Sequence, residues 1–186
     1  EYNKPGNVYC GLIHRLDRPT SGIVAFAKTS KALSRMNAIF EKREVEKKYY
    51  AITRIKPPQS QAHLKHFLKK NQQKNKSFPA SATTKGAKEA RLDYRLIAES
   101  ERYFLLEVLL HTGRHHQIRA QLAQEGMPIK GDLKYGFPRS NPDASISLHA
   151  GKLKFTHPIG PATTVEINAP CLADDKLWTI FNEYIA

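Results

Sequence analysis

The spacing of apolar residues is the feature that most constrains how this chain can fold. Short apolar runs rich in β-branched and aromatic residues recur between Gly, Pro and Ser clusters, which is typical of strands separated by turns. Three longer segments instead place apolar residues at helical spacing. Because strands and helices do not alternate regularly, the sequence predicts an α+β fold, with a mixed, largely antiparallel sheet flanked by helices. We expect residues 1–186 to form a single domain.

The expected elements can be given by residue number. The run at residues 23–27 is predicted to be a buried strand, and residues 90–98 and 103–110 are predicted to form a hairpin. Further strands are expected at residues 47–54, 145–149, 152–155 and 163–167. Helices are expected after a cap at Thr29 or Ser30, over residues 115–125, and over residues 177–185, with an apolar face of Leu177, Ile180, Phe181 and Tyr184.

Positive charge is concentrated in one part of the chain. The formal net charge is +13, and no Asp or Glu lies between Lys47 and Lys88, a stretch with eleven Lys and Arg residues. A long acid-free run predicts a polyanionic partner, with a merely solvated basic face as the alternative. Residues 59–86 within it are expected to form a basic, partly ordered surface arm or hairpin rather than a disordered linker.

Several protein classes are excluded by what the sequence lacks. No apolar run approaches the roughly 20 residues of a membrane span, and no signal-peptide pattern opens the chain. The Gly-rich phosphate loops of nucleotide-binding proteins are missing. Cys10 and Cys171 form no CxxC motif and no zinc-ligand set with histidines, so we expect a reducing, cytoplasmic location, with a Cys10–Cys171 disulfide as the less favoured alternative.

The first candidate for chemistry is Asp17, in the segment HRLDRPTSG over residues 14–22. Pro19 fixes one backbone angle and Gly22 permits a turn that other residues resist, so Asp17 lies on a tight loop. A rigid scaffold beneath such a loop favours a functional role. The alternative is that Asp17 is a structural acid of the turn that pairs with Arg15 or Arg18. Taken alone, this segment favours the alternative.

Two other clusters carry suitable side chains. Lys47 and Tyr49 begin a strand on which Tyr49 and Tyr50 face opposite sides, and spacing alone does not choose between the tyrosines. Residues 112–119 turn into a helix, whose N-terminus suits an anion. Arg114 or Arg119 can keep an aspartate ionised.

The residue types near these clusters favour chemistry without a metal. Metal-dependent nucleases need several acids around Mg²⁺, and only Asp17 stands out here. His115 and His116 lack the spacing of metal ligands. One acid, one tyrosine and several arginines in a basic chain indicate metal-free chemistry on a nucleic acid, and a metal-dependent nuclease is the lower-ranked alternative.

Five ordered motifs resemble those of the RluA-type pseudouridine synthases. Residues 14–22 match the family's HRLD-x-x-TSG, and Lys47-x-Tyr49-x-Ala51 resembles the second motif. The other three are LHTGRHHQIR over residues 110–119, PIKGD over residues 128–132 with Tyr135-Gly136, and LHA over residues 148–150 with Phe155-x-His157-Pro158. The match differs from the family at His115, where Thr or Ser is usual. The sequence NKPG over residues 3–6 lies too close to His14 to be the family's N-terminal NKP-x-G element, so we expect the N-terminal part of the family domain to be missing.

The resemblance implies the pseudouridine synthase catalytic fold and the isomerisation of uridine to pseudouridine in ribosomal or transfer RNA. It makes Asp17 the essential nucleophile or base and selects Tyr49 over Tyr50 as the tyrosine that stacks on uracil. Arg119 is the first choice to pair with Asp17 and Arg114 the second, while Arg15 would fill the space that the flipped base leaves. No cofactor, nucleotide or metal is expected. A catalytically idle RNA-binding module on the same fold is the alternative.

The remaining residues expected to contact RNA or substrate are Thr20, Lys47, Arg114 and Gln117, with Lys69 and Lys70 of the basic stretch. We expect a monomer that acts on RNA in the cytoplasm and does not associate with membranes.

Overall fold

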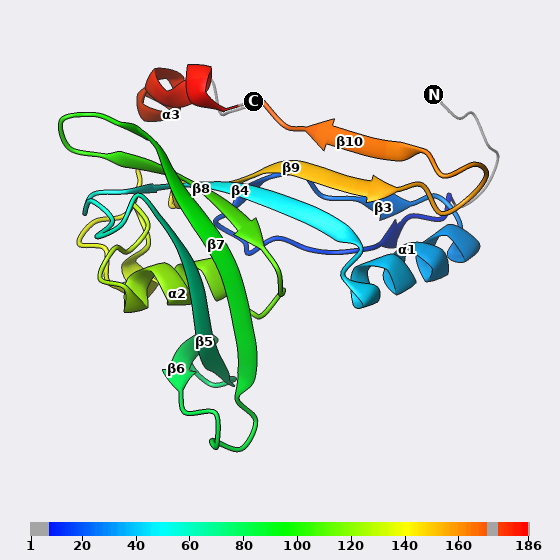
Figure 1. The fold of residues 1–186 in the computed structure, drawn as a ribbon, viewed down its shortest axis with the longest axis horizontal. Helices are drawn as coiled ribbons and strands as arrows, with labels where there is room; N and C mark the ends of the chain where they lie inside the picture. The colour runs from blue at the N-terminus through cyan, green and yellow to red at the C-terminus, as the bar shows by residue number, and fades with distance from the viewer. Residues whose placement is uncertain (1–7, 171–174, 186) are drawn as a thin grey trace.

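A computed structural model describes residues 8–170 and 175–185 of the chain. A largely antiparallel sheet of eight strands forms its centre (Figure 1). The path of the sheet runs β10 (Thr164–Asn168), β9 (Leu148–Thr156), β4 (Val45–Thr53), β8 (Phe104–Leu110), β7 (Lys88–Glu99), β5 (Gln61–Asn71) and β6 (Lys76–Ala80). The short strand β2 (Ser21–Gly22) pairs in parallel with β9, and β1 (Gly11–Leu12) and β3 (Phe26–Ala27) form a separate antiparallel pair.

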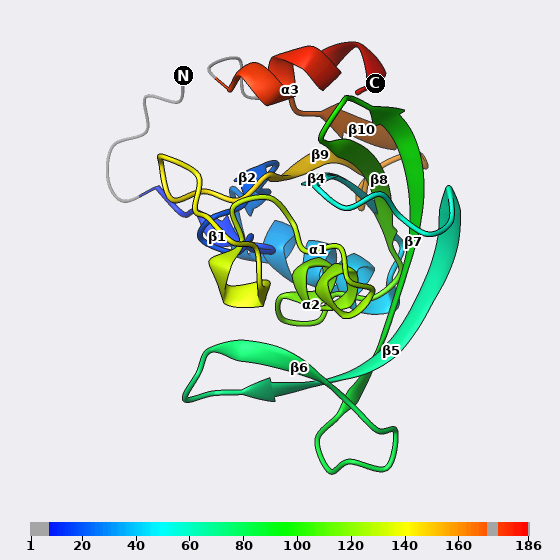
Figure 2. The same ribbon diagram turned by 90° about the vertical axis from the view of Figure 1, so that its left-hand side faces the viewer.

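The described residues also contain three α-helices and two short 3₁₀ turns. The helices are α1 (Ser30–Lys42), α2 (Gln117–Gln124) and α3 (Lys176–Phe181), and the 3₁₀ turns span Leu133–Tyr135 and Asn182–Tyr184. Figure 2 shows the sheet curving around α1 and α2, while α3 lies against its outer side. The predicted α+β class with a mixed, largely antiparallel sheet is therefore confirmed.

Strand β4 divides the core into two clusters because its side chains alternate between the faces of the sheet. Ala51 packs with Ile118 and Leu122 of α2 on the inner face. Tyr50 and Ile52 pack on the outer face with residues of α3. Tyr49, next to Tyr50, is consequently turned toward the inner side, where α1 and α2 lie.

Several sequence predictions are confirmed in detail. The hairpin of β7 and β8 forms with its turn at residues 100–103, and β10 covers the predicted run. Helix α1 is capped by the Thr29 hydroxyl, which accepts from the Ala32 N–H at 3.1 Å. The left-handed Gly126 ends the turn after α2, as its position predicts.

The predicted buried strand at residues 23–27 is wrong. Within these residues the structure contains only the two-residue strand β3, and of the run only Ala27 is buried, while Val24 and Phe26 are exposed. The run lies outside the main sheet. Its strand β3 pairs only with β1, so the other edge of β3 has no strand beside it among the described residues.

The predicted strands at 145–149 and 152–155 are largely one strand, β9, which continues through a shift of its register with β4 at Gly151. A Cβ at Gly151 would meet the Tyr50 ring at 2.4 Å, so the glycine permits close packing between β9 and β4. Residues 59–86 also differ from a simple surface arm. Their first part, β5, pairs with β7 along its length and buries Leu64 and Leu68, and their second part, β6, contacts α2.

Two helix predictions need correction. Helix α2 begins at Gln117, since His116 has the left-handed φ of 52° and cannot continue a helical turn. Helix α3 ends at Phe181, and Ile180 and Tyr184 of its predicted apolar face are 58% and 49% exposed. The buried pair is Trp178 and Phe181, which lie three residues apart on one face of α3 and pack against Tyr50 on the outer face of the sheet.

Two features of the sequence lie outside the described residues: the NKPG match at residues 3–6 and Cys171, and with it the alternative disulfide. In the described part of the chain, no helix has the length and apolar character that a membrane crossing requires.

Replacing Trp178 should test the outer core cluster. Trp178 is 2% exposed and packs among Tyr50 and Phe181, so Trp178→Ala should lower the free energy of unfolding by about 3–5 kcal/mol. Ile180→Ala on the same helix should change it by less than about 0.5 kcal/mol, since Ile180 is exposed. Urea unfolding measures both, and equal effects would contradict the observed helix orientation.

Candidate active site

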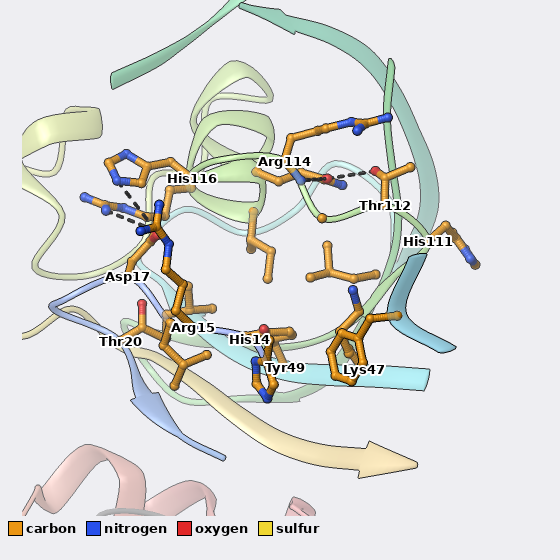
Figure 3. A pocket seen from close by; sticks show the side chains of 18 of the residues that line it. His14, Arg15, Asp17, Thr20, Lys47, Tyr49, His111, Thr112, Arg114 and His116 are labelled. Carbon is orange, nitrogen blue, oxygen red and sulfur yellow. Dashed lines mark hydrogen bonds and ion pairs between the residues drawn. The ribbon is translucent and has the colours of Figure 1, made fainter. Parts of the chain in front are cut away.

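A cavity of about 480 Å³ lies between the loop before β2, the end of α1, β4 and the segment that follows β8 (Figure 3). Its lining includes Arg15, Asp17, Lys47, Tyr49 and Arg119. The three clusters that the sequence leaves far apart along the chain therefore meet in one place.

The loop that carries Asp17 is fixed to β9. The Thr20 N–H donates to the Asp17 carbonyl at 2.8 Å, and the Pro19 carbonyl accepts from the Ile146 N–H at 2.9 Å. Gly22 has a φ of 114°, and a Cβ there would lie 2.3 Å from a backbone oxygen of β9. Only glycine fits this close parallel pairing, so the motif's backbone residues hold the Asp17 loop against the sheet.

Arg119 reaches Asp17 from α2 while a second carboxylate holds it. Its Nε and Nη2 donate to the two oxygens of Asp132 at 2.7 and 2.8 Å, and its Nη1 lies 3.3 Å from Asp17 Oδ2. Arg119 and Asp132 side chains are 4% and 1% exposed, whereas Asp17 is 26% exposed. The pairing of Asp17 with Arg119, the first choice of the sequence analysis, is the one present.

Arg119 stays positively charged although its side chain is buried. Burial lowers the pKa of Arg119, but hydrogen bonds and charges from Asp132 and Asp17 outweigh it, and the net pKa lies above its ordinary value. Arg119 therefore presents a fixed positive charge to Asp17.

Arg114 and Gln117 brace the loop. Arg114 is directed away from Asp17, and its Nε donates to the Glu89 carbonyl at 2.7 Å (Figure 3). Gln117 is 3% exposed; its Oε1 accepts from the Thr112 hydroxyl and the Arg114 N–H, and its Nε2 donates to the Arg91 carbonyl. The Gln117 amide is thus engaged within the protein, and because the residue also lines the cavity, its contact with RNA or substrate stays a prediction.

Tyr49 faces the cavity from β4, and the alternation of the strand puts Tyr50 in the outer core. Burial, followed by the charge of Asp17, raises the pKa of Tyr49 to about 12, so its hydroxyl is protonated at neutral pH. Lys47 lies in the same lining, and burial followed by the charge of Arg43 lowers its pKa. The cavity thus has an aromatic wall and a cation on one strand.

His116 is a site residue to which sequence reasoning gives no role. Its Nε2 lies 3.8 Å from Asp17 Oδ2, and its Nδ1 lies 3.1 Å from the Tyr135 hydroxyl. Burial, followed by the charge of Arg119, lowers the pKa of His116 to about 3, so the ring is neutral. The Tyr135 hydroxyl donates to the Ser77 carbonyl and accepts from the Ser77 N–H.

Asp132 and Tyr135 also had no predicted role, although both belong to the fourth motif. The motif match itself was the signal in the sequence, since it singles out Asp132 and Tyr135, but the burial of Asp132 is seen only in the structure. The spacing of residues along the sequence does not show that the partner of Asp132 is Arg119.

The other predicted RNA contacts divide by location. Arg15 is exposed at the cavity, and Thr20 lines it with a buried hydroxyl that has no hydrogen-bond partner among the described residues. Lys69 and Lys70 are exposed on β5. Burial, then the charge of Lys70, lowers the pKa of His115, next to His116. The Lys70 side chain therefore lies on the side of β5 that faces the cavity. Because side chains alternate along a strand, the Lys69 side chain lies on the opposite side.

Comparisons with known proteins show which proteins this chain resembles. A family model described as RNA pseudouridylate synthase matches residues 1–124. The chain is 34% identical to tRNA pseudouridine synthase C of Haemophilus ducreyi, over 92% of this chain and 76% of that protein. It is 33% identical to the protein of the same name from Vibrio parahaemolyticus, over 92% and 75%. Human RNA Pseudouridylate Synthase Domain Containing 4 shares the fold, with a TM-score of 0.76 and 22% identity over 93% of this chain and 75% of the human chain.

Removing the charge of Asp132 should expose how strongly Arg119 depends on it. Asp132→Asn leaves a buried guanidinium without its main counter-charge, so the free energy of unfolding should fall by about 3–5 kcal/mol in urea titrations. Glu99→Gln breaks the exposed pair of Glu99 with Lys56 and should cost no more than about 1 kcal/mol. Similar losses in the two variants would show that Asp132 does not hold Arg119.

Proposed function

This chain belongs to the RNA pseudouridylate synthase family, and we propose that Asp17 is the carboxylate with which it isomerises uridine in RNA to pseudouridine. In this reaction the C1′–N1 bond breaks, the uracil turns, and C5 bonds to C1′. The C5 proton leaves and N1 takes up a proton, so uridine and pseudouridine have the same composition. One carboxylate with a fixed counter-charge suits such a reaction, which needs no redox step.

The observation that carries the proposal is the arrangement of Asp132, Arg119 and Asp17. Asp132 uses two bonds of the guanidinium, and Nη1 of Arg119 remains for Asp17. Asp17 is therefore an oriented anion that is still 26% exposed to the cavity. Attack on C1′, attack on C6 and removal of the C2′ proton are all open to this carboxylate.

Tyr49 is proposed as the surface on which the uracil stacks. Extracting a base from a helix costs a few kcal/mol. Stacking on an aromatic ring returns roughly 1–3 kcal/mol. Since the pKa of Tyr49 is about 12, partly because of the Asp17 charge, the phenol is a hydrogen-bond donor in the resting enzyme. Bonding of Asp17 to substrate would remove the negative charge beside Tyr49 and so lower the pKa of the phenol, which must give up its own proton before it can accept the one from C5.

The remaining groups of the cavity are proposed to hold the nucleotide. The Thr20 hydroxyl, buried and without a partner in the described structure, is suited to bond a ribose or uracil oxygen. Lys47 supplies a cation for a phosphate. Arg15, exposed at the edge, is proposed to fill the space in the RNA that the base leaves, and Arg114 to contact the backbone nearby.

The substrate class is proposed from the printed names of the relatives. Two relatives that match 92% of this chain are tRNA pseudouridine synthases, which favours transfer RNA over ribosomal RNA. We also propose a monomer, because residues of one chain form the cavity. A cytoplasmic location accords with Cys10, an exposed free thiol.

Replacing Asp17 distinguishes catalysis from idle RNA binding, the alternative on this fold. Asp17→Asn keeps the shape but removes the anion, so pseudouridine formation on transfer RNA should fall by about 10²–10⁴-fold or more. RNA affinity, measured by filter binding, should stay within about threefold. The matched control Asp143→Asn alters an exposed aspartate outside the cavity and should retain activity. Undiminished activity of Asp17→Asn would refute the assignment of Asp17.

Charge reversal on β5 tests the basic surface. The double variant Lys69→Glu, Lys70→Glu should weaken RNA binding and reduce the dependence of log K on log salt by about 1–2, because phosphate contacts are lost. Lys176→Glu on α3, at the outer side of the sheet, is the matched control and should bind RNA like the parent chain. If the double variant binds with unchanged affinity and salt slope, β5 does not contact RNA.

A further inference from the structure

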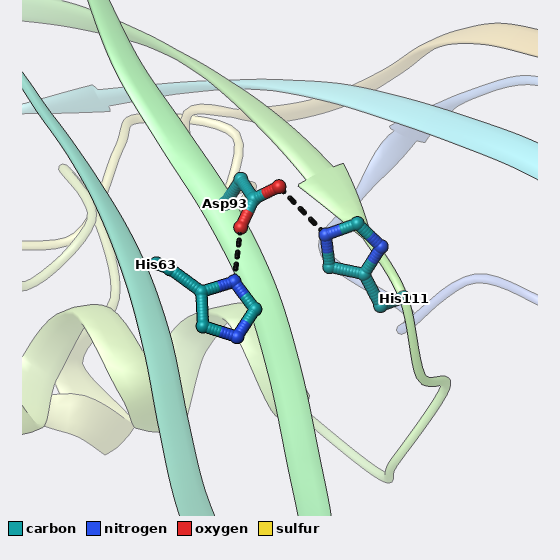
Figure 4. A group of neighbouring side chains, drawn as sticks. All are labelled: His63, Asp93 and His111. Carbon is teal, nitrogen blue, oxygen red and sulfur yellow. Dashed lines mark hydrogen bonds and ion pairs between the residues drawn. The ribbon is translucent and has the colours of Figure 1, made fainter.

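Three side chains that the reaction does not use meet on the sheet, at one side of the cavity. They are His63 of β5, Asp93 of β7 and His111, the residue after β8 (Figure 4). The Asp93 carboxylate lies between the two rings: one oxygen contacts His63 Nδ1, and the other lies 2.7 Å from His111 Nε2. Three potential ligand atoms, two imidazole nitrogens and one carboxylate oxygen, all lie within 4.8 Å of one another.

Strand pairing brings these residues together. His63 is the direct cross-strand partner of Asp93, and Asp93 is the partner of Leu109. His111 follows Leu109 by two residues, so strand periodicity returns it to the same side of the sheet. The ligands come from three chain segments, and their spacing in the sequence contains no metal motif.

The charges around the three side chains are compatible with a bound cation. Burial raises the pKa of Asp93, but hydrogen bonds from His63 and His111 outweigh it and hold the pKa below its ordinary value, so Asp93 is an anion at neutral pH. Neighbouring cations have acidic partners: Arg95 lies 3.2 Å from Glu107, and Lys65 lies 3.3 Å from Glu89.

The cluster is open enough for an ion to enter. The side chains of His63, Asp93 and His111 are 54%, 42% and 35% exposed. A hollow of about 580 Å³ on this side of the sheet is lined by His63 and Asp93, together with Glu107. An ion held by the three ligands would keep a side open to solvent.

We propose that His63, Asp93 and His111 bind one divalent transition-metal ion, with Zn²⁺ as the preferred ion. Two imidazole nitrogens and one carboxylate oxygen are a donor set that suits Zn²⁺, and three protein ligands leave one position of a tetrahedron for solvent. To bind the ion, each ring must present an unprotonated nitrogen, so protons compete with the ion and binding weakens as the pH falls.

Such an ion would link β5, β7 and the start of the loop that contains Thr112 and Arg114. His111 also lines the catalytic cavity, although Figure 3 shows its ring directed away from Asp17. The ion is therefore structural and takes no part in the reaction at Asp17. The proposal goes beyond the proposed function and does not rest on it.

Titration of the full chain with Zn²⁺ by calorimetry tests the site. The expected result is one equivalent bound with a dissociation constant in the micromolar range or tighter, and a rise in Tm. His63→Ala and Asp93→Asn should each weaken binding at least tenfold. His157→Ala, which removes an exposed histidine outside the cluster, should bind like the parent chain. Both His63 and Asp93 are largely exposed, so these variants are expected to fold, which circular dichroism checks.

Co²⁺ provides a second readout, since bound Co²⁺ in a site with nitrogen and oxygen ligands gives visible absorption bands that His63→Ala should abolish. The proposal is overturned if Zn²⁺ shows no saturable binding, or if His63→Ala binds with the affinity of the parent chain. It is equally overturned if His157→Ala, rather than His63→Ala, removes the binding. Any of these results would leave the cluster as a carboxylate hydrogen-bonded by two histidines.

Discussion

The buried guanidinium of Arg119 is the group on which the site depends. Burying a charge is costly unless it is paired and hydrogen-bonded, and Asp132 meets that requirement with two short bonds. Asp132 neutralises the arginine structurally, so Asp17 is not needed to keep Arg119 in place. Asp17 therefore remains partly exposed to the cavity while Nη1 of Arg119 contacts one of its oxygens. The two carboxylates share one cation but have different tasks.

The sheet supplies the rigid frame for this pair. Strand β4 directs Tyr49 to the cavity and Tyr50 to the outer core, where α3 covers it. Gly22 lets the Asp17 loop approach β9, and the Gln117 amide fixes the loop that leads into α2. Each catalytic candidate is thus set by backbone pairing or by a buried hydrogen bond. This arrangement limits the motion of Asp17 and Tyr49 relative to one another, as a precisely oriented reaction requires.

Periodicity predicted the fold well where one face of an element is buried. The hairpin of β7 and β8, helix α1 and strand β10 follow from apolar spacing and turn residues. It failed where tertiary contacts decide exposure. Residues 23–27 are apolar but lie beside a two-stranded pair, and the apolar face of α3 ends at a 3₁₀ turn. Among the candidate site residues, Asp17, Tyr49 and Arg119 could be selected from their motifs. The burial of the Gln117 amide could not be predicted, because its internal hydrogen bonds form only in the folded chain.

By itself, the sequence determined the fold class, the basic character and the motifs that place this chain in its family, because strand and helix periods and motif order are local or linear properties. Tertiary structure alone decided that Arg119 rather than Arg114 reaches Asp17, that Asp132 holds it, and that His116 lies beside the pair. It also brought His63, Asp93 and His111 together from three segments. These contacts join residues up to 102 positions apart, and only the packing of the folded chain brings such residues together.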